Sequence, residues 1–215
     1  GNRQRIMAAS TAAGPAFEGG NISCGVAGVP GAVCAVTIEN GAASCRTIGG
    51  LMPVGLCGTG VLETVYELLQ AGIMDESGRL EAPYEDVFPL TGDIRFTQKD
   101  VREVQLAKAA IRAGMETLIE SYGIARGEIG RVYLAGGFGQ KIDLVKAAGI
   151  GLLPEDLIGR TTAVGNTSLA GAEILAADPS FARRLVRTAG MAEEISLAGS
   201  RLFSEYYIDH MLFER

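Results

Sequence analysis

Three glycine-rich segments carry the residue types that could hold a nucleotide against the main chain. They lie at 10–20, 55–60 and 135–139. Glycine has no β-carbon and readily adopts positive φ, so a ligand can approach backbone N–H groups there without meeting a side chain. A triphosphate is strongly anionic, and N–H groups at helix N-termini attract anions, so these segments suggest phosphate binding. For 135–139 a tight strand-to-helix turn without a ligand stays open, because a single glycine motif is weak evidence.

The spacing of the glycines disagrees with two common nucleotide motifs. A P-loop needs G-x-x-x-x-G-K-[ST], and no such string occurs. A dinucleotide fingerprint needs G-x-G-x-x-G or a final alanine, whereas the strings that begin at Gly58 and Gly137 end in Glu63 and Ile142. The protein-kinase strings H-R-D and D-F-G are also missing.

Composition indicates a globular protein. With 215 residues, 47% hydrophobic and 20% charged, the chain can bury a core without a disulfide or metal. Its net charge of −6 disfavours nucleic-acid and membrane-surface partners, which require basic patches. We expect a cytoplasmic protein, because the sequence shows neither an apolar run of membrane-spanning length nor a secretory signal.

The four cysteines do not have the spacing of a metal site. Nine, ten and eleven residues separate them, unlike the short spacings of zinc and iron–sulfur ligands. His210 is the one histidine. We therefore expect no metal ligands and four buried thiols, at Cys24, Cys34, Cys45 and Cys57.

Local patterns predict the strands that position the glycine segments. β-Favouring runs predict strands at 5–10, 33–38 and 42–48, and Asn40-Gly41 predicts that the last two form a hairpin. The apolar run at 132–134 predicts a strand that leads directly into the third glycine segment. Strands followed by helices indicate the α/β class.

Apolar residues three and four apart predict the helices. The predicted ranges are 61–72, 97–122, 141–149 and 165–177, with mixed helical character at 181–190 and 200–213. Thr59 is expected to cap the first helix, and Thr97 with Asp100 forms a capping box for the second. We expect the charged face of the second helix to be solvated: Arg102, Glu103, Lys108, Arg112 and Glu116.

Two further stretches have a predicted role. Residues 78–92 read as a surface excursion, because Pro83 and Pro89 rule out a long helix. The small residues at 170–172 suggest that the helix there packs closely on a neighbour.

At the glycine-rich segments the chain resembles the superfamily of acetate and sugar kinases, heat-shock chaperone ATPases and actin, in which a glycine pair after a strand lies against adenosine. Within it, the chain is similar to the C-terminal ATPase domain of the reductive activators of corrinoid proteins. The Gly-Thr-Gly element also resembles one in the ATPase activators of dehydratases and benzoyl-CoA reductase. The resemblance covers about residues 5 to 175 in collinear order, and its strings are Ala9–Gly19, Gly55–Gly60, Thr97–Lys108, Leu134–Gly139 and Gly165–Ala172.

This resemblance implies an actin-like ATPase fold of the ribonuclease H-like type, with a mixed sheet flanked by helices in two half-domains. Residues 1–50 would be the remainder of the first half-domain and 51–215 the second. Family members carry an N-terminal [2Fe–2S] ferredoxin domain, and a strand with Asp-x-Gly-Thr cradles phosphate and metal. Both would lie ahead of this sequence, so we expect the chain alone to bind nucleotide weakly.

The resemblance also implies a function. Members couple hydrolysis of ATP, with Mg²⁺, to one-electron reduction of cob(II)alamin to cob(I)alamin on a partner. The partner would be a corrinoid protein or a corrinoid-dependent methyltransferase, and a homodimer is left open. Two alternatives remain: a small-molecule kinase of the same superfamily, and a nucleotide-independent interaction module whose glycines serve helix packing.

Carried over by position, the family's contacts fall on three groups of residues. Phosphates would face Ala13, Gly14, Gly19, Gly58, Thr59 and Gly60, and adenosine would face Ala135, Gly136, Gly137 and Phe138. Gln105 and Lys108 would reach the base or ribose, with a solvated helix face as the alternative. Glu18 and Asp143 would orient Mg²⁺ or the attacking water as catalytic acids, with a cap or surface role as the alternative.

Overall fold

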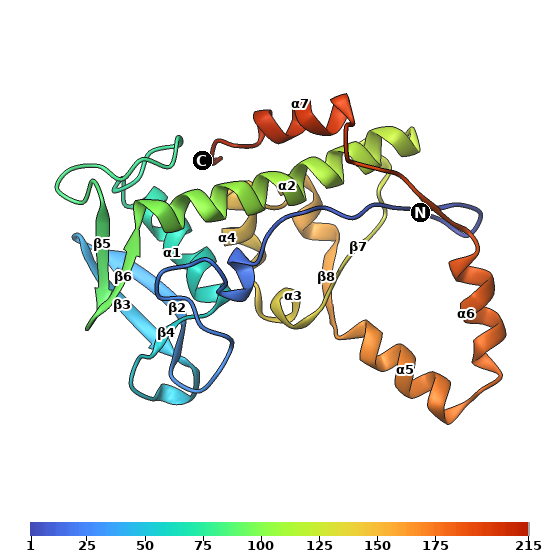
Figure 1. Cartoon of the computed structure of the whole chain (residues 1–215), viewed down its shortest axis with the longest axis horizontal. Coiled ribbons are helices and arrows are strands. Elements are labelled where there is room, and N and C mark those ends of the chain that lie inside the picture. The colour runs from blue at the N-terminus through green and yellow to red at the C-terminus, as the bar shows by residue number, and fades with distance from the viewer. Residues whose placement is uncertain (215) are drawn as a thin grey trace.

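Helices and strands alternate along the chain, which confirms the predicted α/β class (Figure 1). A computed structural model describes residues 1–214. The strands are β1 (Ile6–Ala8), β2 (Ala32–Glu39), β3 (Ala42–Thr47), β4 (Gly55–Leu56), β5 (Val87–Thr91), β6 (Ile94–Thr97), β7 (Val132–Ala135), β8 (Thr161–Gly165) and β9 (Ala192–Glu194). The α-helices are α1 (Gly58–Gln70), α2 (Gln98–Tyr122), α3 (Gly137–Lys141), α4 (Leu144–Gly149), α5 (Thr167–Ala177), α6 (Phe181–Ala189) and α7 (Arg201–Asp209). Short 3-10 turns are η1 (Ala16–Glu18), η2 (Ile48–Gly50), η3 (Arg126–Glu128) and η4 (Glu155–Arg160).

The strands of the described residues form four small sheets instead of one large mixed sheet. β2 lies between β3, to which it is antiparallel, and β4, to which it is parallel. β1 pairs with β9 and β7 pairs with β8, both in parallel, and β5 and β6 form an antiparallel hairpin. The three-stranded sheet includes strands from both sides of the predicted boundary between residues 50 and 51, and the division into half-domains stays a prediction.

The predicted hairpin at Asn40-Gly41 is confirmed. Both residues have positive φ, 51° and 77°, as a two-residue turn that matches strand twist requires. The register pairs Glu39 with Ala42 directly across the turn. The strand predicted at 5–10 is confirmed in its centre, as β1.

Helix α1 packs on β2 and forms the middle of the core. Its residues Val61, Val65 and Leu68 are fully buried, as helical spacing predicts. The helix begins one residue before Thr59, so the expected Thr59 cap is wrong. The N-cap is Cys57, because the strand β4 keeps the backbone extended up to that residue and its N–H donates to the Val33 carbonyl over 3.1 Å.

The long helix α2 spans the molecule with the predicted capping box at its start (Figure 1). Asp100 N donates to the Thr97 hydroxyl, and Thr97 N donates to the Asp100 carboxylate. The inner face of α2 joins the core through buried Val101 and Val104.

The expectation of a solvated outer face on α2 is wrong for three residues. Lys108, Arg112 and Glu116 are buried, because α7 and the chain end pack along the helix. Figure 1 shows α7 lying beside α2. Arg102 is exposed and Glu103 half-buried, as befits the part of α2 that α7 does not cover.

Other local predictions also need correction. The helix predicted at 141–149 is split into α3 and α4, because Ile142 is extended. Residues 78–92 are not only an excursion, since they include β5, which accommodates Pro89 as one strand of a two-stranded ribbon. The small residues at 170–172 do not pack closely, since α5 buries none of its residues. Of the four thiols, Cys57 is buried and the other three are half-buried; all are free.

No helix within residues 1–214 combines the length and apolarity needed to cross a membrane.

Candidate functional site

Residues of all three glycine segments meet at one cavity of about 860 Å³. One wall is the start of α1, at Gly58 and Thr59, and another is the start of α3, at Gly137 and Phe138. Phe17 and Glu18 of η1 supply part of the wall from the first glycine segment. Segments from three distant parts of the sequence therefore face a common space.

The α1 wall presents main-chain donors. The first N–H of α1 with an intrahelical partner is that of Val61, which donates to the Cys57 carbonyl over 2.9 Å. The N–H groups of the preceding turn, from Gly58 to Gly60, have no carbonyl of their own helix to reach. They lie at the positive end of a 13-residue helix, so an anion placed against them is stabilised.

The glycines of α1 have a packing reason as well. A β-carbon at Gly58 would lie 1.9 Å from the Phe17 carbonyl oxygen, and one at Gly60 would lie 2.2 Å from that of Val33. No side chain fits at either position. Glycine there brings α1 against η1 and β2, whether or not a ligand is present.

Gly136 and Gly137 differ from this pair. Gly136 has a φ of 97°, which L side chains rarely adopt, so the turn out of β7 itself requires glycine. Gly137 needs no such conformation, and a β-carbon added to it would meet no atom within 4 Å. No packing within the described chain explains Gly137, and the space that its missing side chain leaves opens onto the cavity.

Two aromatic rings connect the segments. The ring of Phe138 stacks on that of Phe17, with centroids 5.2 Å apart and planes inclined by 26°. A Phe138 ring carbon also lies 3.1 Å from the position of a Gly58 β-carbon. Phe138 of α3 thus contacts η1 and lies against the start of α1.

Charged side chains of both signs line the cavity. Arg46, at the end of β3, and Lys141, at the end of α3, make no ion pair with any residue in the described part of the chain. Glu63 is already engaged, since its carboxylate accepts from the Lys146 ammonium over 2.9 Å and from Val36 N over 3.1 Å. Sequence reasoning missed Arg46 and Lys141, because only the fold brings them to the glycine segments.

Lys146 shows that the acidic side of this region is compensated. It bridges Glu63 and Glu67 at 2.9 Å and 3.0 Å. Burial alone lowers the pKa of Lys146, but its hydrogen bonds to the two carboxylates outweigh burial and raise it. Lys146 therefore stays protonated, and Glu63 is neutralised before any anion enters the cavity.

The two predicted catalytic acids lie in different places. Glu18 lines the cavity and is exposed. Asp143 caps α4 instead, where its carboxylate accepts from Val145 N and Lys146 N at 2.9 Å and 3.1 Å. The capping alternative therefore describes the contacts of Asp143, and Glu18 is the acid that the structure brings to the glycine segments.

Gln105 and Lys108 do not line the cavity. The Gln105 amide donates to the carbonyls of Ser77 and Met211, and the Lys108 ammonium donates to the carbonyl of Leu212 and lies 5.3 Å from the Phe213 ring centroid. Burial lowers the pKa of Lys108 to about 8, an effect that nearby Glu214 partly offsets. Both side chains bind the chain end to α2.

The remaining predicted contacts do not line the cavity. Gly19 has a φ of 82°, and a β-carbon there would lie 2.5 Å from the Val26 carbonyl oxygen, so the local turn requires glycine. The residues that do not line the cavity are Ala13, Gly14, Gly19, Gly60, Ala135 and Gly136.

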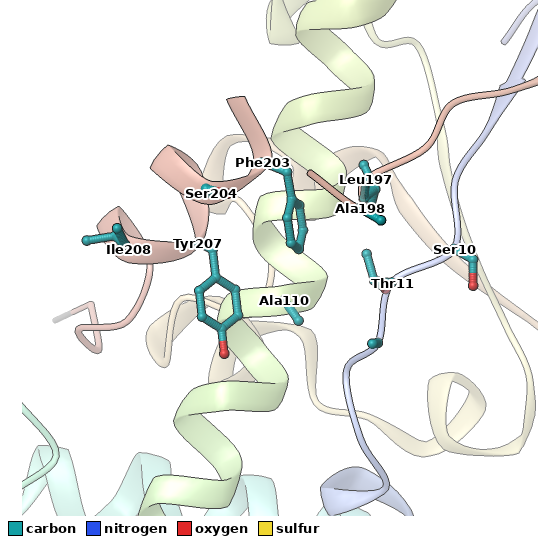
Figure 2. A pocket seen from close by; sticks show the side chains of 10 residues that line it. Ser10, Thr11, Ala110, Leu197, Ala198, Phe203, Ser204, Tyr207 and Ile208 are labelled. Carbon is teal, nitrogen blue, oxygen red and sulfur yellow. The ribbon is translucent and has the colours of Figure 1, made fainter. Parts of the chain in front are cut away.

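A second cavity, of about 500 Å³, contains none of the predicted site residues. It lies between the segment after β1, helix α2 and helix α7, and Figure 2 shows the Phe203 and Tyr207 side chains of α7 pointing into it. Its walls are mainly apolar, including Ala110 and Leu197. It has no cationic side chain to bind a phosphate.

The chemical groups that line the first cavity suit a nucleotide. It offers main-chain donors and two cations for phosphates, and an open glycine beside an aromatic ring for a base. Residues 1–214 contain no group of three or more His, Cys, Asp or Glu side chains that could bind a metal ion. Mg²⁺ commonly binds through one or two carboxylates together with substrate phosphates, and Glu18 is placed for that arrangement.

Known proteins are similar to this chain in sequence. Residues 1–215 match the family described as "C-terminal domain of RACo the ASKHA domain". The chain is 32% identical to the corrinoid activation enzyme RamQ of Eubacterium limosum, over 99% of the chain and 40% of that protein. It is 30% identical to the [Co(II) methylated amine-specific corrinoid protein] reductase of Methanosarcina barkeri, over 95% of the chain and 42% of that protein.

A solved structure is also similar. It is titled "Reductive activator for corrinoid,iron-sulfur protein", and it matches with a TM-score of 0.91 and 31% sequence identity. The match covers 99% of this chain and 37% of that one. The chain thus spans about two fifths of the length of the relatives that it matches.

Proposed function

This chain belongs to the family of C-terminal ASKHA domains of RACo, and from that premise we propose that it binds ATP between α1 and α3 in a protein that reductively activates a corrinoid protein. One observation supports the binding site above all: Gly58 and Thr59 line the same cavity as Gly137 and Phe138. The family and the relatives named for corrinoid activation support the process that the nucleotide serves.

The proposed roles follow from what each wall offers. The N–H groups at the start of α1 receive the phosphates, and Arg46 and Lys141 offset their charge. The adenosine lies along Gly137, with Phe138 packed against it. Phosphoryl transfer depends mainly on positioning and on neutralising charge, so a nucleophilic side chain is not needed.

Glu18 is the acid proposed to act on the reacting phosphate. It is exposed at the cavity wall and accepts no ion pair from the described residues. Its carboxylate would hold a water of the Mg²⁺ shell or orient the water that attacks the γ-phosphate. Bound Mg²⁺ would supply neutralisation of the phosphate charge.

ATP hydrolysis is proposed to drive a one-electron reduction. In the full-length protein, a [2Fe–2S] domain would give one electron to the partner's Co(II) corrinoid, which becomes Co(I), while ATP and water become ADP and phosphate. The role of this domain would be to change its docking on the corrinoid protein with nucleotide state, through movement of the α3 wall relative to the α1 wall.

Isothermal titration calorimetry with Mg-ATP and Mg-ADP tests the binding step. We expect saturable heat from both nucleotides, and stronger binding in the native-length protein than in the 215-residue chain. If neither protein gives binding heat or a thermal shift with either nucleotide, nucleotide binding is refuted. Turnover that a sugar or a carboxylic acid accelerates would instead favour a small-molecule kinase.

The reductive step has its own test. The native-length protein is mixed with a reductant and a corrinoid protein in the Co(II) state, and Co(I) is followed by its absorbance. We expect Mg-ATP to accelerate Co(I) formation at least tenfold. Equal rates with and without ATP would show that the nucleotide does not drive the reduction.

A further inference from the structure

The segment from Thr161 to Ser196 is fully folded but buries none of its residues. It contains β8, α5, α6 and β9, and nearly half of its side chains are apolar, as in the whole chain. Figure 1 shows α5 and α6 extending away from the rest of the molecule after β8. We call β8, α5 and α6 together the arm.

The arm exposes large apolar side chains on each of its three elements. Val164 of β8 is 38% exposed, Leu169 of α5 is 54% exposed and Val186 of α6 is 70% exposed. Ile174 and Leu185 are about half exposed. α5 packs against α6, and its contact with every other element is at most marginal. Apolar surface of this kind marks an interaction site in a soluble protein.

Short helices of this length are not stable without tertiary packing. In water an isolated helix below about 12 to 15 residues is marginal, and α5 and α6 have 11 and 9 residues. The sequence nevertheless specifies α5, since the Asn166 side chain accepts from Leu169 N over 3.0 Å as its N-cap. A capped helix pair without a core requires packing from outside the described chain.

The adjacent sheets are incomplete in the same way. Parallel sheets in α/β proteins are covered on both faces. β7 and β8 form a parallel pair of two strands, and β8 has three exposed residues out of five. β1 and β9 form a second parallel pair, in which every residue of β9 is exposed.

The charged side chains of α6 are all basic, and Glu173 of α5 is the acidic residue of the arm. Arg183, Arg184 and Arg187 lie on α6, and none of them forms an ion pair with a residue between 1 and 214. An apolar surface beside three arginines fits a partner with apolar side chains and an acidic rim.

We infer that the arm is the docking surface for another folded part of the same polypeptide, a β-sheet unit with apolar faces and acidic edge residues. The solved relative supports this occupant, because it matches 99% of this chain, arm included, while 63% of its own length (100 − 37) lies outside the match. In that relative, the equivalent of the arm lies within a longer chain. A segment joined ahead of Gly1 would emerge beside β9, where the arm ends (Figure 1).

A second copy of this chain is a weaker fit. A two-fold dimer places the same surface of each copy in contact, so the α6 arginines of both copies, six in all, would lie in one interface. Like charges brought together at an interface disfavour association. A different folded unit with acidic residues avoids this repulsion.

Hydrogen–deuterium exchange tests whether the arm is covered. Amide exchange rates are measured in the 215-residue chain and in the native-length protein purified from its source. We expect amides of Thr161–Ser196 to exchange at least tenfold more slowly in the native-length protein, while α1 and the first half of α2 are equally protected in both. Equally fast exchange of the arm in both proteins would refute the inference. Concentration-dependent protection in the 215-residue chain, with the mass of a dimer by light scattering, would replace it with self-association.

A matched pair of variants tests the surface itself in the native-length protein. Val186→Asp places a charge on the arm, and Ile208→Asp places one on α7, where the side chain is equally exposed at 70%. We expect Val186→Asp to remove most of the arm's protection and Ile208→Asp to leave it unchanged. Unchanged protection in Val186→Asp, or equal loss in both variants, would contradict docking at the arm. Neither nucleotide binding nor corrinoid reduction enters these readouts.

Discussion

The ring of Phe138 lies stacked on the ring of Phe17, 5.2 Å away between centroids. The two residues are 121 positions apart (138 − 17). Their contact joins α3, which follows β7, to the 3-10 turn η1. Both residues line the larger cavity. A group that binds between α1 and α3 must therefore contact these two rings. The position of the rings can report whether the cavity is occupied.

Replacing Phe138 by alanine should weaken nucleotide binding. The ring supplies apolar contact at the cavity wall, and its stacking on Phe17 holds the adenosine segment near α1. We expect Kd for Mg-ATP, measured by calorimetry, to rise about tenfold, which corresponds to about 1.4 kcal/mol. Phe203→Ala is the control, since Phe203 is also half-buried and pairs with Tyr207 at the second cavity. An equal loss in both variants would mean that the site is elsewhere.

Valine at Gly137 should abolish binding without harming the fold. A β-carbon at Gly137 meets no protein atom within 4 Å, so the branched side chain would occupy ligand space instead. We expect an unchanged unfolding free energy and at least a 100-fold weaker Kd for Mg-ATP. Gly159→Val, in η4, is the matched control because its β-carbon also meets nothing within 4 Å and the residue lies outside the cavity. Normal binding by Gly137→Val would show that the open space serves no nucleotide.

Gly58→Ala should have the opposite profile. Its β-carbon would lie 1.9 Å from the Phe17 carbonyl oxygen, so the helix must shift. We expect a loss of about 1–3 kcal/mol in unfolding free energy from urea titration, the usual cost of overpacking. Stability equal to the unsubstituted chain would mean that α1 and η1 are not packed as described.

Substitutions at Glu18 and Asp143 should affect different properties, ATP hydrolysis for Glu18 and the free energy of unfolding for Asp143. Glu18→Gln keeps the size of an exposed side chain and removes its charge, so we expect a tenfold or greater loss of ATP hydrolysis with unchanged unfolding. Asp143→Ala removes two hydrogen bonds from the N-cap of α4 and should cost about 1 kcal/mol of stability, with hydrolysis by the folded protein retained. If the effects are exchanged between the two variants, Asp143 is the catalytic acid.

The buried Lys108 should make stability depend on pH. Burial lowers its pKa from 10.5 to about 8, so between these values the unfolded chain binds more protons than the folded one. Unfolding free energy should therefore rise with pH from about 8 to 10.5, relative to Lys108→Met, by up to about 1.4 kcal/mol per pH unit. Below pH 8 the difference should be constant.

The comparison with Lys108→Met is needed because another group acts in the opposite sense. Burial, and then the charge of Asp100, raise the pKa of Cys24 from 9.0 to about 11, which lowers stability as pH rises through that range. Both proteins carry Cys24, so its contribution cancels. A difference that is flat from pH 7 to 10.5 would mean that Lys108 is solvated in the folded chain.

Local signals predicted much of the secondary structure. Asn40-Gly41 and the pair Thr97 and Asp100 act through contacts a few residues apart, so their sequence alone determines the hairpin and the capping box. The cap of α1 was misplaced by two residues because Cys57 is held by β2, a strand more than twenty positions away. Such a distant hydrogen bond leaves no local signal.

Long-range packing explains the other differences. The charges of Lys108 and Arg112 are typical of a solvated helix face, and only the return of the chain at α7 buries them. The small residues at 170–172 suggest a packed helix, yet α5 buries none of its residues among those that the structure describes. Arg46 and Lys141 reach the cavity only through the fold, while the glycine segments were visible as strings.

Nucleotide-dependent protection of backbone amides tests the central claim most directly. Hydrogen–deuterium exchange is measured on the native-length protein with and without Mg-ATP at a concentration that calorimetry shows to be saturating. We predict that amides of 57–61 and of 135–139 become protected together, with the same dependence on ATP concentration. Saturation with neither segment protected, or with only one of them protected, would contradict a shared site between α1 and α3.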